Sequence, residues 1–186
     1  MTSVLVVTGS VRPNSINQKM VPVVVEVAKA KGLEVIIADL GELNLPFYDN
    51  PLPPTSPDFV TDNANVLRWT DMVRKADGVI LVTPEYNHTM SPIQLNAVDW
   101  IGKEWSDKPI ALVGYGWRSG AQQAHAAARE ALAVNLKARV GDEQTNLLVT
   151  RELNPDGTVA DKEATYKKIG ATIDELIEII KETHGE

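Results

Sequence analysis

A loop rich in hydroxyl and amide groups follows the first apolar run of the chain, and its residue types suit the binding of an anion. The loop spans residues 8–17 and carries Ser10, Arg12, Ser15 and Asn17 just before a predicted helix. A helix start offers backbone N–H groups and a positive dipole end, and arginine adds a charged donor. The signatures of dinucleotide and triphosphate sites are missing, which favours a terminal monophosphate. The alternative is ordinary helix capping by Ser15 or Asn17.

Other chemistries are excluded by the residues that the chain lacks. It has no cysteine, which rules out disulfides, thiolate metal sites, iron–sulfur clusters and cysteine nucleophiles. The three histidines, His88, His125 and His184, are not spaced as metal ligands, and no His-Glu-x-x-His motif occurs, so we expect no metal site. Any redox work must therefore be done by a bound cofactor.

Four short aliphatic runs predict strands, at residues 4–7, 35–38, 79–82 and 110–113. The runs are continuous rather than alternating, which is typical of strands covered by helices on both faces. A fifth strand is expected within residues 139–150.

Segments with helical spacing separate these runs, at residues 17–30, 66–76, 95–100, 120–135 and 166–180. Strands that alternate with helices, joined by right-handed crossovers, predict a doubly wound α/β fold with a parallel sheet and helices on both faces. Its ligand site should lie outside the carboxyl ends of the strands. A length of 186 residues with 44% hydrophobic composition is enough for one core, so we expect residues 1–186 to form a single domain.

One long segment, residues 41–61, has neither helical nor strand spacing. It contains five prolines, at positions 46, 51, 53, 54 and 57. Long irregular connections in compact domains are often functional covers or mobile segments. Two readings stay open for this segment, a lid over the site and a proline-stiffened surface loop.

Three separated motifs stand out along the chain, namely Gly9-Ser10-x-Arg12-x-x-Ser15-x-Asn17, then Pro84-Glu85-Tyr86-Asn87, then Leu95-Asn96-x-x-Asp99-Trp100. Together they resemble the NAD(P)H-dependent FMN reductase family, which includes related quinone, azo and chromate reductases. The likeness covers roughly the first two thirds of the chain. It implies a flavodoxin-like, five-stranded sheet in the order 2-1-3-4-5, with FMN as cofactor and NADPH or NADH as electron donor.

The same resemblance assigns roles to the motif residues. Ser10, Arg12, Ser15 and Asn17 are expected to surround the FMN phosphate, and Pro84, Glu85, Tyr86 and Asn87 to line the isoalloxazine ring. An extended turn that contains proline offers peptide groups along one edge of a flat ring, and an aromatic side chain offers it a surface. No protein side chain is expected to be catalytic, because hydride transfer takes place at the flavin N5.

The end of the fourth predicted strand departs from the family pattern. Gly116 matches a glycine-rich turn that contacts the flavin, whereas Tyr115, Trp117 and Arg118 are bulkier than the family's usual residues. These three are candidate substrate contacts. For Trp117 two roles are open: stacking on the ring or on substrate, and packing at a subunit contact. For Arg118 two roles are also open: binding a phosphate of the nicotinamide cofactor or an anionic acceptor, and pairing with a carboxylate of a neighbouring subunit.

Charge and the amino-terminal sequence limit the partners. A formal charge of −7 and the lack of any lysine and arginine cluster argue against nucleic acid. No apolar run is long enough to span a bilayer, and the first residues lack the pattern of a signal peptide, so we expect a cytoplasmic protein without a membrane partner. Family resemblance implies a homodimer or homotetramer with the flavin near the subunit contact.

The sequence thus predicts an enzyme that passes electrons from NAD(P)H through FMN to a small acceptor such as a quinone, a flavin, an azo dye or a metal oxyanion. The second hypothesis is a non-enzymatic FMN electron carrier like a flavodoxin. The reductase-like turn at residues 84–87 and the lack of a strongly acidic patch stand against it. A phosphoacceptor domain would need an acidic pair after the first strand and an aspartate after the third, and neither is present.

Overall fold

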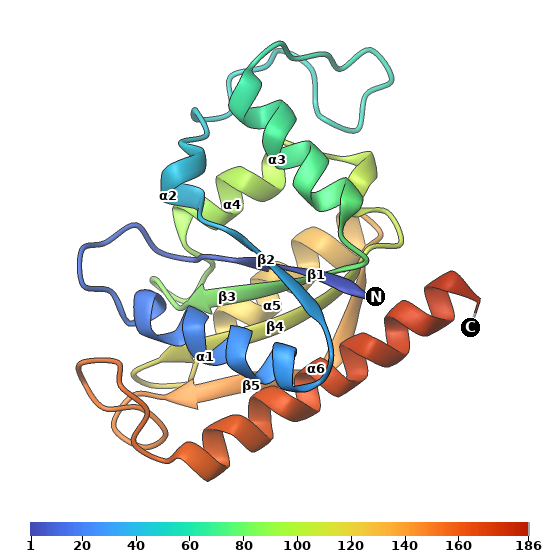
Figure 1. Ribbon diagram of the computed structural model, residues 1–186. Helices are drawn as coiled ribbons and strands as arrows, with labels where there is room; N and C mark the ends of the chain where they lie inside the picture. Colours follow the sequence, from blue (N-terminus) through green and yellow to red (C-terminus); the bar gives the residue numbers. More distant parts are fainter. Residues whose placement is uncertain (186) are drawn as a thin grey trace.

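Five parallel strands form a sheet in the order β2-β1-β3-β4-β5 in the computed structural model, which describes residues 1–185 (Figure 1). The strands are β1 (Ser3–Val7), β2 (Glu34–Ala38), β3 (Gly78–Pro84), β4 (Pro109–Gly116) and β5 (Arg139–Leu148). The predicted flavodoxin-like order is therefore confirmed, and the fifth strand lies within the segment where it was expected.

Helices cover both faces of this sheet, as predicted. One face carries α1 (Ile16–Ala30) and α6 (Lys162–His184), and the opposite face carries α2 (Leu40–Leu43), α3 (Ala64–Lys75), α4 (Pro92–Asp99) and α5 (Gln122–Arg129). Polar residues begin several of these helices. The side chains of Asn63, Ser91 and Asp161 accept hydrogen bonds from backbone N–H groups at the starts of α3, α4 and α6, which satisfies donors that a helix leaves unpaired.

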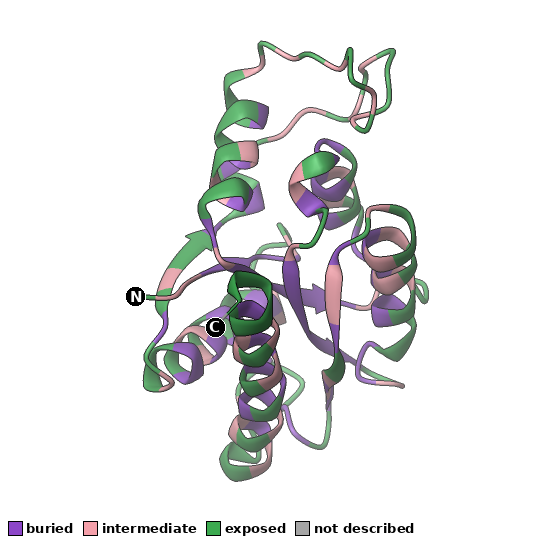
Figure 2. Ribbon diagram, turned by 90° about the vertical axis from the view of Figure 1, so that its right-hand side faces the viewer, coloured by how far each residue is buried: buried purple, intermediate pink, exposed green. Residues whose placement is uncertain are grey.

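Alternate residues of the central strands serve the two faces. Along β3, Val79 and Leu81 pack with α3 and α4, while Ile80 and Val82 pack with α1 and α6. Burying each such side chain contributes about 1.5–3 kcal/mol. Figure 2 shows that the strands at the centre of the sheet are buried and that the long loop preceding α3 is largely exposed.

The second strand corrects one expectation. We predicted that its aliphatic run would be covered on both faces, yet Ile36 and Ile37 are 39% and 48% exposed. The reason is its place at the edge of the sheet, where β2 pairs with β1 alone and the covering helices extend over it only in part. Apolar composition predicted the strand correctly and its burial wrongly.

Two further segments differ in detail from the expected elements. Residues 120–135 form two pieces, because a left-handed Gly120 and Ala121 precede α5 and a π-helical segment, Glu130–Asn135, follows it. The proline-rich segment begins with the short helix α2 and continues as an irregular loop to Asn63.

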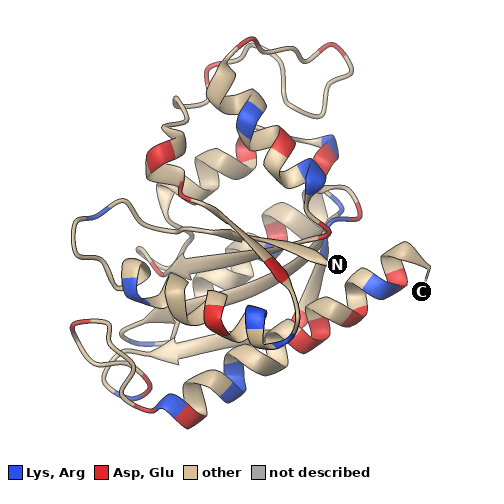
Figure 3. Ribbon diagram, in the orientation of Figure 1, with Lys and Arg blue, Asp and Glu red and all other residues tan. Residues whose placement is uncertain are grey.

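Charged residues are dispersed over the outer surface. Figure 3 shows Lys and Arg interspersed with Asp and Glu along the helices rather than gathered on one of them. No helix among residues 1–185 has both the length and the apolar character needed to cross a membrane.

Candidate functional site

The loop between β1 and α1 is held against β3 by a buried amide. Asn17 is only 1% exposed, and its Oδ1 accepts from the backbone N–H of Gly9 at 2.9 Å while its Nδ2 donates to the carbonyl of Val82 at 2.9 Å. A Cβ on Gly9 would lie 2.2 Å from that carbonyl and 2.5 Å from Cδ of Pro84. The predicted site residue Asn17 thus lies beneath the loop, where it fixes the loop's position.

The start of α1 has an unused hydroxyl. Ser15 occupies the N-cap position, yet its side chain caps no backbone N–H, and its buried Oγ has no hydrogen-bond partner among residues 1–185. Buried hydroxyl groups in proteins are normally paired. The first N–H groups of the helix also have no intrahelical acceptor. An anionic oxygen at this point would satisfy both, which favours anion binding over the capping alternative for Ser15.

The turn after β3 comes next to this loop. The hydroxyl of Tyr86 lies 2.9 Å from Oγ of Ser10, and the guanidinium of Arg12 lies 5.9 Å from the centre of the tyrosine ring. Left-handed conformations at Asn87 (φ 51°) and His88 (φ 63°) make the turn tight enough to return the chain to α4. The structure therefore brings together the loop and the turn that two separate motifs predicted.

The carboxylate of Glu85 is directed to α5. It accepts from Oγ of Ser119 at 3.0 Å and from the backbone N–H groups of Gln123 and Ala124 at 3.0 and 3.4 Å. The residue at the N-cap of α5 is Ala121, which has no side-chain acceptor. Glu85 therefore caps this helix from the neighbouring loop, a role that the family motif did not indicate.

A cavity of about 290 Å³ opens above these elements, and we call it the loop cavity. Residues 12–16, 84–86 and 115–117 line it, together with Val149 and Pro155. Eight predicted site residues are among them, namely Arg12, Ser15, Pro84, Glu85, Tyr86, Tyr115, Gly116 and Trp117. Of the other predicted residues, Ser10 lies two positions before the lining stretch that begins at Arg12, and Asn17, Asn87 and Arg118 do not line the cavity.

Three residues at the end of β4 depart from the family pattern, and their surroundings differ. Tyr115 is buried, and burial raises the pKa of its phenol, so it is a neutral wall of the cavity at physiological pH. Trp117 is 60% exposed, and Arg118 is exposed and makes no hydrogen bond or ion pair within the described residues. Trp117 and Arg118 are thus accessible to a ligand.

Sequence reasoning missed one wall of the cavity, the loop between β5 and α6. Its Pro155 lines the cavity, and its Asp156 lies 3.2 Å from Nζ of Lys19 on α1. The buried carboxylate of Glu152 holds the loop by accepting from the backbone N–H of Leu148 at 2.9 Å. The turn sequence at residues 154–157, Asn-Pro-Asp-Gly, was the available signal. In the described part of the chain, no three acidic or histidine side chains gather as a metal site would require.

Comparison with known proteins agrees with this geometry. Residues 2–150 match the family model described as NADPH-dependent FMN reductase. The NAD(P)H-dependent FMN reductase ntnL of a Nectria species is 30% identical over 75% of this chain and 72% of its own. A quinone reductase of Pseudomonas putida is 34% identical over 60% of this chain and 58% of its own.

A solved structure shows the same fold over nearly the whole chain. FerB, a flavoenzyme NAD(P)H:(acceptor) oxidoreductase from Paracoccus denitrificans, superimposes with a TM-score of 0.76 and 27% identity, covering 98% of this chain and 99% of that one. The motif resemblance found in the sequence is therefore confirmed, and this chain belongs to the NADPH-dependent FMN reductase family of flavodoxin-like enzymes, with FMN as cofactor and NAD(P)H as electron donor.

Proposed function

We propose that this protein oxidises NAD(P)H and passes the electrons through bound FMN to a small-molecule acceptor. The observation that carries the proposal is the unpartnered Ser15 hydroxyl at the start of α1, in a cavity that continues to the turn at residues 84–86. A phosphate at one end and a flat ring at the other match this layout. When bound, FMN accepts a hydride and later gives up two electrons, chemistry that no side chain here supplies.

The residues divide into those that contact FMN and those that position them. Ser10, Arg12 and Ser15 hold the phosphate together with the first backbone N–H groups of α1, because these groups are donors at a positive helix end. Asn17 and Gly9 support that loop from below. The ring lies along residues 84–87 and against Gly116, where any side chain would crowd the backbone N–H of Ala121.

The second substrates approach from the exposed side of this site. Arg118 and Trp117 are placed to contact the nicotinamide cofactor or an anionic acceptor, since both are exposed next to the loop cavity. Quinones come first among the candidate acceptors, because relatives carry the name quinone reductase. Free flavins, azo dyes and metal oxyanions are further candidates.

The proposal extends to assembly and location. Trp117 and Phe47, both well exposed, suit a subunit contact near the site, so a homodimer or homotetramer is expected. A cytoplasmic location would supply NAD(P)H directly.

The test is to purify the protein, record its visible spectrum and measure NAD(P)H oxidation with and without an acceptor. A flavin spectrum with many turnovers per protein supports the enzyme. A flavin spectrum without steady-state NAD(P)H oxidation would instead support the electron-carrier hypothesis. Donor and acceptor must both reach the same flavin edge, so they should bind in turn. Double-reciprocal plots of the rate, with the concentrations of NAD(P)H and acceptor both varied, should therefore give the parallel lines of a ping-pong mechanism.

A further inference from the structure

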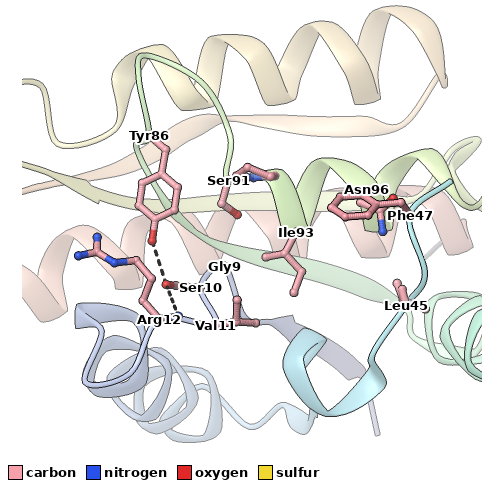
Figure 4. Close-up of a pocket in the computed structure, with 11 residues that line it drawn as sticks. Gly9, Ser10, Val11, Arg12, Leu45, Phe47, Tyr86, Ser91, Ile93 and Asn96 are labelled. Atoms are coloured by element: carbon pink, nitrogen blue, oxygen red, sulfur yellow. Dashed lines mark hydrogen bonds between the residues drawn. The ribbon is translucent and has the colours of Figure 1, made fainter.

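The two side chains at the centre of the turn after β3 reach opposite neighbours. The Tyr86 hydroxyl lies 2.9 Å from Oγ of Ser10, on the loop after β1 (Figure 4). The Glu85 carboxylate instead accepts from Oγ of Ser119 at 3.0 Å, just before α5. Both turn residues line the loop cavity. The turn along which we place the flavin ring therefore has an aromatic group on one side and a carboxylate on the other.

This carboxylate is shielded from water. The Glu85 side chain is 9% exposed, and a Cβ built on Gly116 would lie 3.5 Å from the Glu85 Cβ. Gly116 belongs to the second segment against which we place the ring. Because little solvent surrounds the side chain, its charge is screened less than that of a surface residue and acts over several ångströms.

No full positive charge is set against Glu85. The other buried carboxylate near the loop cavity, Glu152, is 4% exposed and lies 2.5 Å from Nζ of Lys168 and 2.6 Å from the guanidinium of Arg151. Among residues 1–185 no lysine or arginine forms an ion pair with Glu85. Its basic neighbour is His88, whose Nδ1 lies 3.6 Å away and whose side chain is 65% exposed, so water weakens that interaction.

Neutral donors hold the Glu85 carboxylate in place. They are the hydroxyl of Ser119 and the backbone N–H groups of Gln123 and Ala124 at the start of α5. The positive end of a helix is equivalent to about half an elementary charge, which compensates a carboxylate only in part. A net negative charge therefore remains in the wall of the cavity.

A charge at this place bears on the reaction because reduction changes the charge of the flavin. Hydride transfer leaves the oxidised nicotinamide one charge more positive and the flavin one charge more negative. We infer that the Glu85 carboxylate lowers the reduction potential of the bound flavin by disfavouring this added charge. The inference rests on the proposed function and assigns to Glu85 a role besides that of helix cap. A lower potential makes the reduced flavin a stronger reductant, which extends the acceptors it can reduce.

The experiment measures the reduction potential of the FMN-loaded protein without air, against dyes of known potential and with a chemical reductant. Glu85→Gln removes the charge and keeps a hydrogen-bond acceptor for α5. It should raise the ratio of reduced to oxidised flavin about tenfold at a given potential, which is a shift of about 30 mV to more positive values for a two-electron couple. Glu143→Gln removes an exposed carboxylate on β5 and is the control, with no shift expected.

A second variant distinguishes the charge from the shape of the turn. Ser119→Ala removes a neutral donor and leaves the Glu85 charge, so the potential should stay the same or become more negative. A positive shift in both variants would overturn the inference, because a loosened turn would then set the potential. So would an unchanged or more negative potential in Glu85→Gln.

Flavin binding gives a readout that does not depend on turnover. Glu85→Gln should bind reduced FMN about tenfold more tightly relative to oxidised FMN than the wild type does, since the potential and the two affinities are linked. A helix cap alone would change both affinities equally. The expected shift in a protein that does not oxidise NAD(P)H would refute the proposed function and leave this inference standing. NAD(P)H oxidation with equal potentials in wild type and Glu85→Gln would overturn the inference alone.

Discussion

The carboxylate of Glu85 accepts a hydrogen bond from the backbone N–H of Gln123, 3.0 Å away, and so ties the turn after β3 to the helix after β4. Replacing it with alanine should lower the free energy of unfolding by about 1–2 kcal/mol, as loss of a helix cap does, and weaken FMN binding. Glu85→Gln keeps a hydrogen-bond acceptor, so it should retain most of the stability and most of the FMN affinity. Chemical unfolding and FMN titration measure the two effects, with the exposed Glu143→Ala as control. An unchanged FMN affinity in Glu85→Ala would show that the turn holds its shape without this cap.

Arg12 should contribute more to binding FMN than to binding riboflavin, because only FMN carries the phosphate. Arg12→Ala should weaken FMN binding about tenfold to a hundredfold, which corresponds to about 1–3 kcal/mol for a charge-assisted contact. Titration of the apoprotein with both flavins checks this. Arg68→Ala removes the same charge from the exposed surface of α3 and should change neither affinity. If the wild-type protein binds riboflavin as tightly as FMN, the phosphate site is misplaced.

Gly9 should not tolerate a side chain. In Gly9→Ala the new Cβ would meet the carbonyl of Val82 and the ring of Pro84, so the loop and the turn must separate. We expect a loss of stability of about 1–3 kcal/mol together with weaker FMN binding. Gly170→Ala, in the interior of α6 where the nearest atom would be 3.5 Å away, should instead stabilise by up to about 1 kcal/mol. Thermal unfolding of the two variants, compared side by side, tests both expectations.

The buried His125 should make stability depend on pH. Its ring lies against Gly114, and burial lowers its pKa to about 4 from an ordinary value of 6.5. Between these values the unfolded chain binds a proton that the folded chain does not, so stability is fully present above pH about 6.5 and falls as the pH drops towards 4, by up to about 3 kcal/mol. Urea unfolding at several pH values should show a smaller decrease for His125→Asn. Equal decreases in both proteins would mean that carboxylates alone account for the acid sensitivity.

Arg118 should affect the second substrate and not the flavin. Because its guanidinium is exposed and unpaired among the described residues, Arg118→Ala should raise the KM for NADPH or for an anionic acceptor and leave FMN content as it is. Steady-state kinetics per bound flavin give the answer. Loss of flavin or of the oligomer with normal kinetics would assign Arg118 to the structure.

Local patterns were sufficient to predict much of this fold. The aliphatic runs identified the central strands because β3 and β4 are buried on both faces. The same pattern failed for the burial of β2, since composition does not tell which strand lies at the edge of a sheet. The break between α5 and the π-helical segment also has no simple signal, because alanine suits both helical forms.

The positions of site residues were predictable where they belong to short family motifs. The direction of a side chain was not predictable where it depends on a tertiary contact. Ser10, Arg12, Ser15 and Tyr86 were placed near one another because parallel strands end at one edge of the sheet. The sequence did not reveal that Asn17 points beneath its loop or that Glu85 points to α5, since each depends on a distant partner. The wall formed by the β5–α6 loop lies beyond the family motifs altogether.

The double hydrogen bond to the carbonyl of Pro46 divides the proline-rich segment into two parts of different tolerance. Up to Tyr48 the backbone is tied to α4, so a change of length there would move Phe47 and disturb the cavity of about 290 Å³ that Phe47 lines together with Leu45 and Ile93. Beyond it, residues 49–62 form an exposed connection whose length costs little free energy to alter. Insertions or substitutions in that second part should therefore leave the sheet and the loop after β1 as they are.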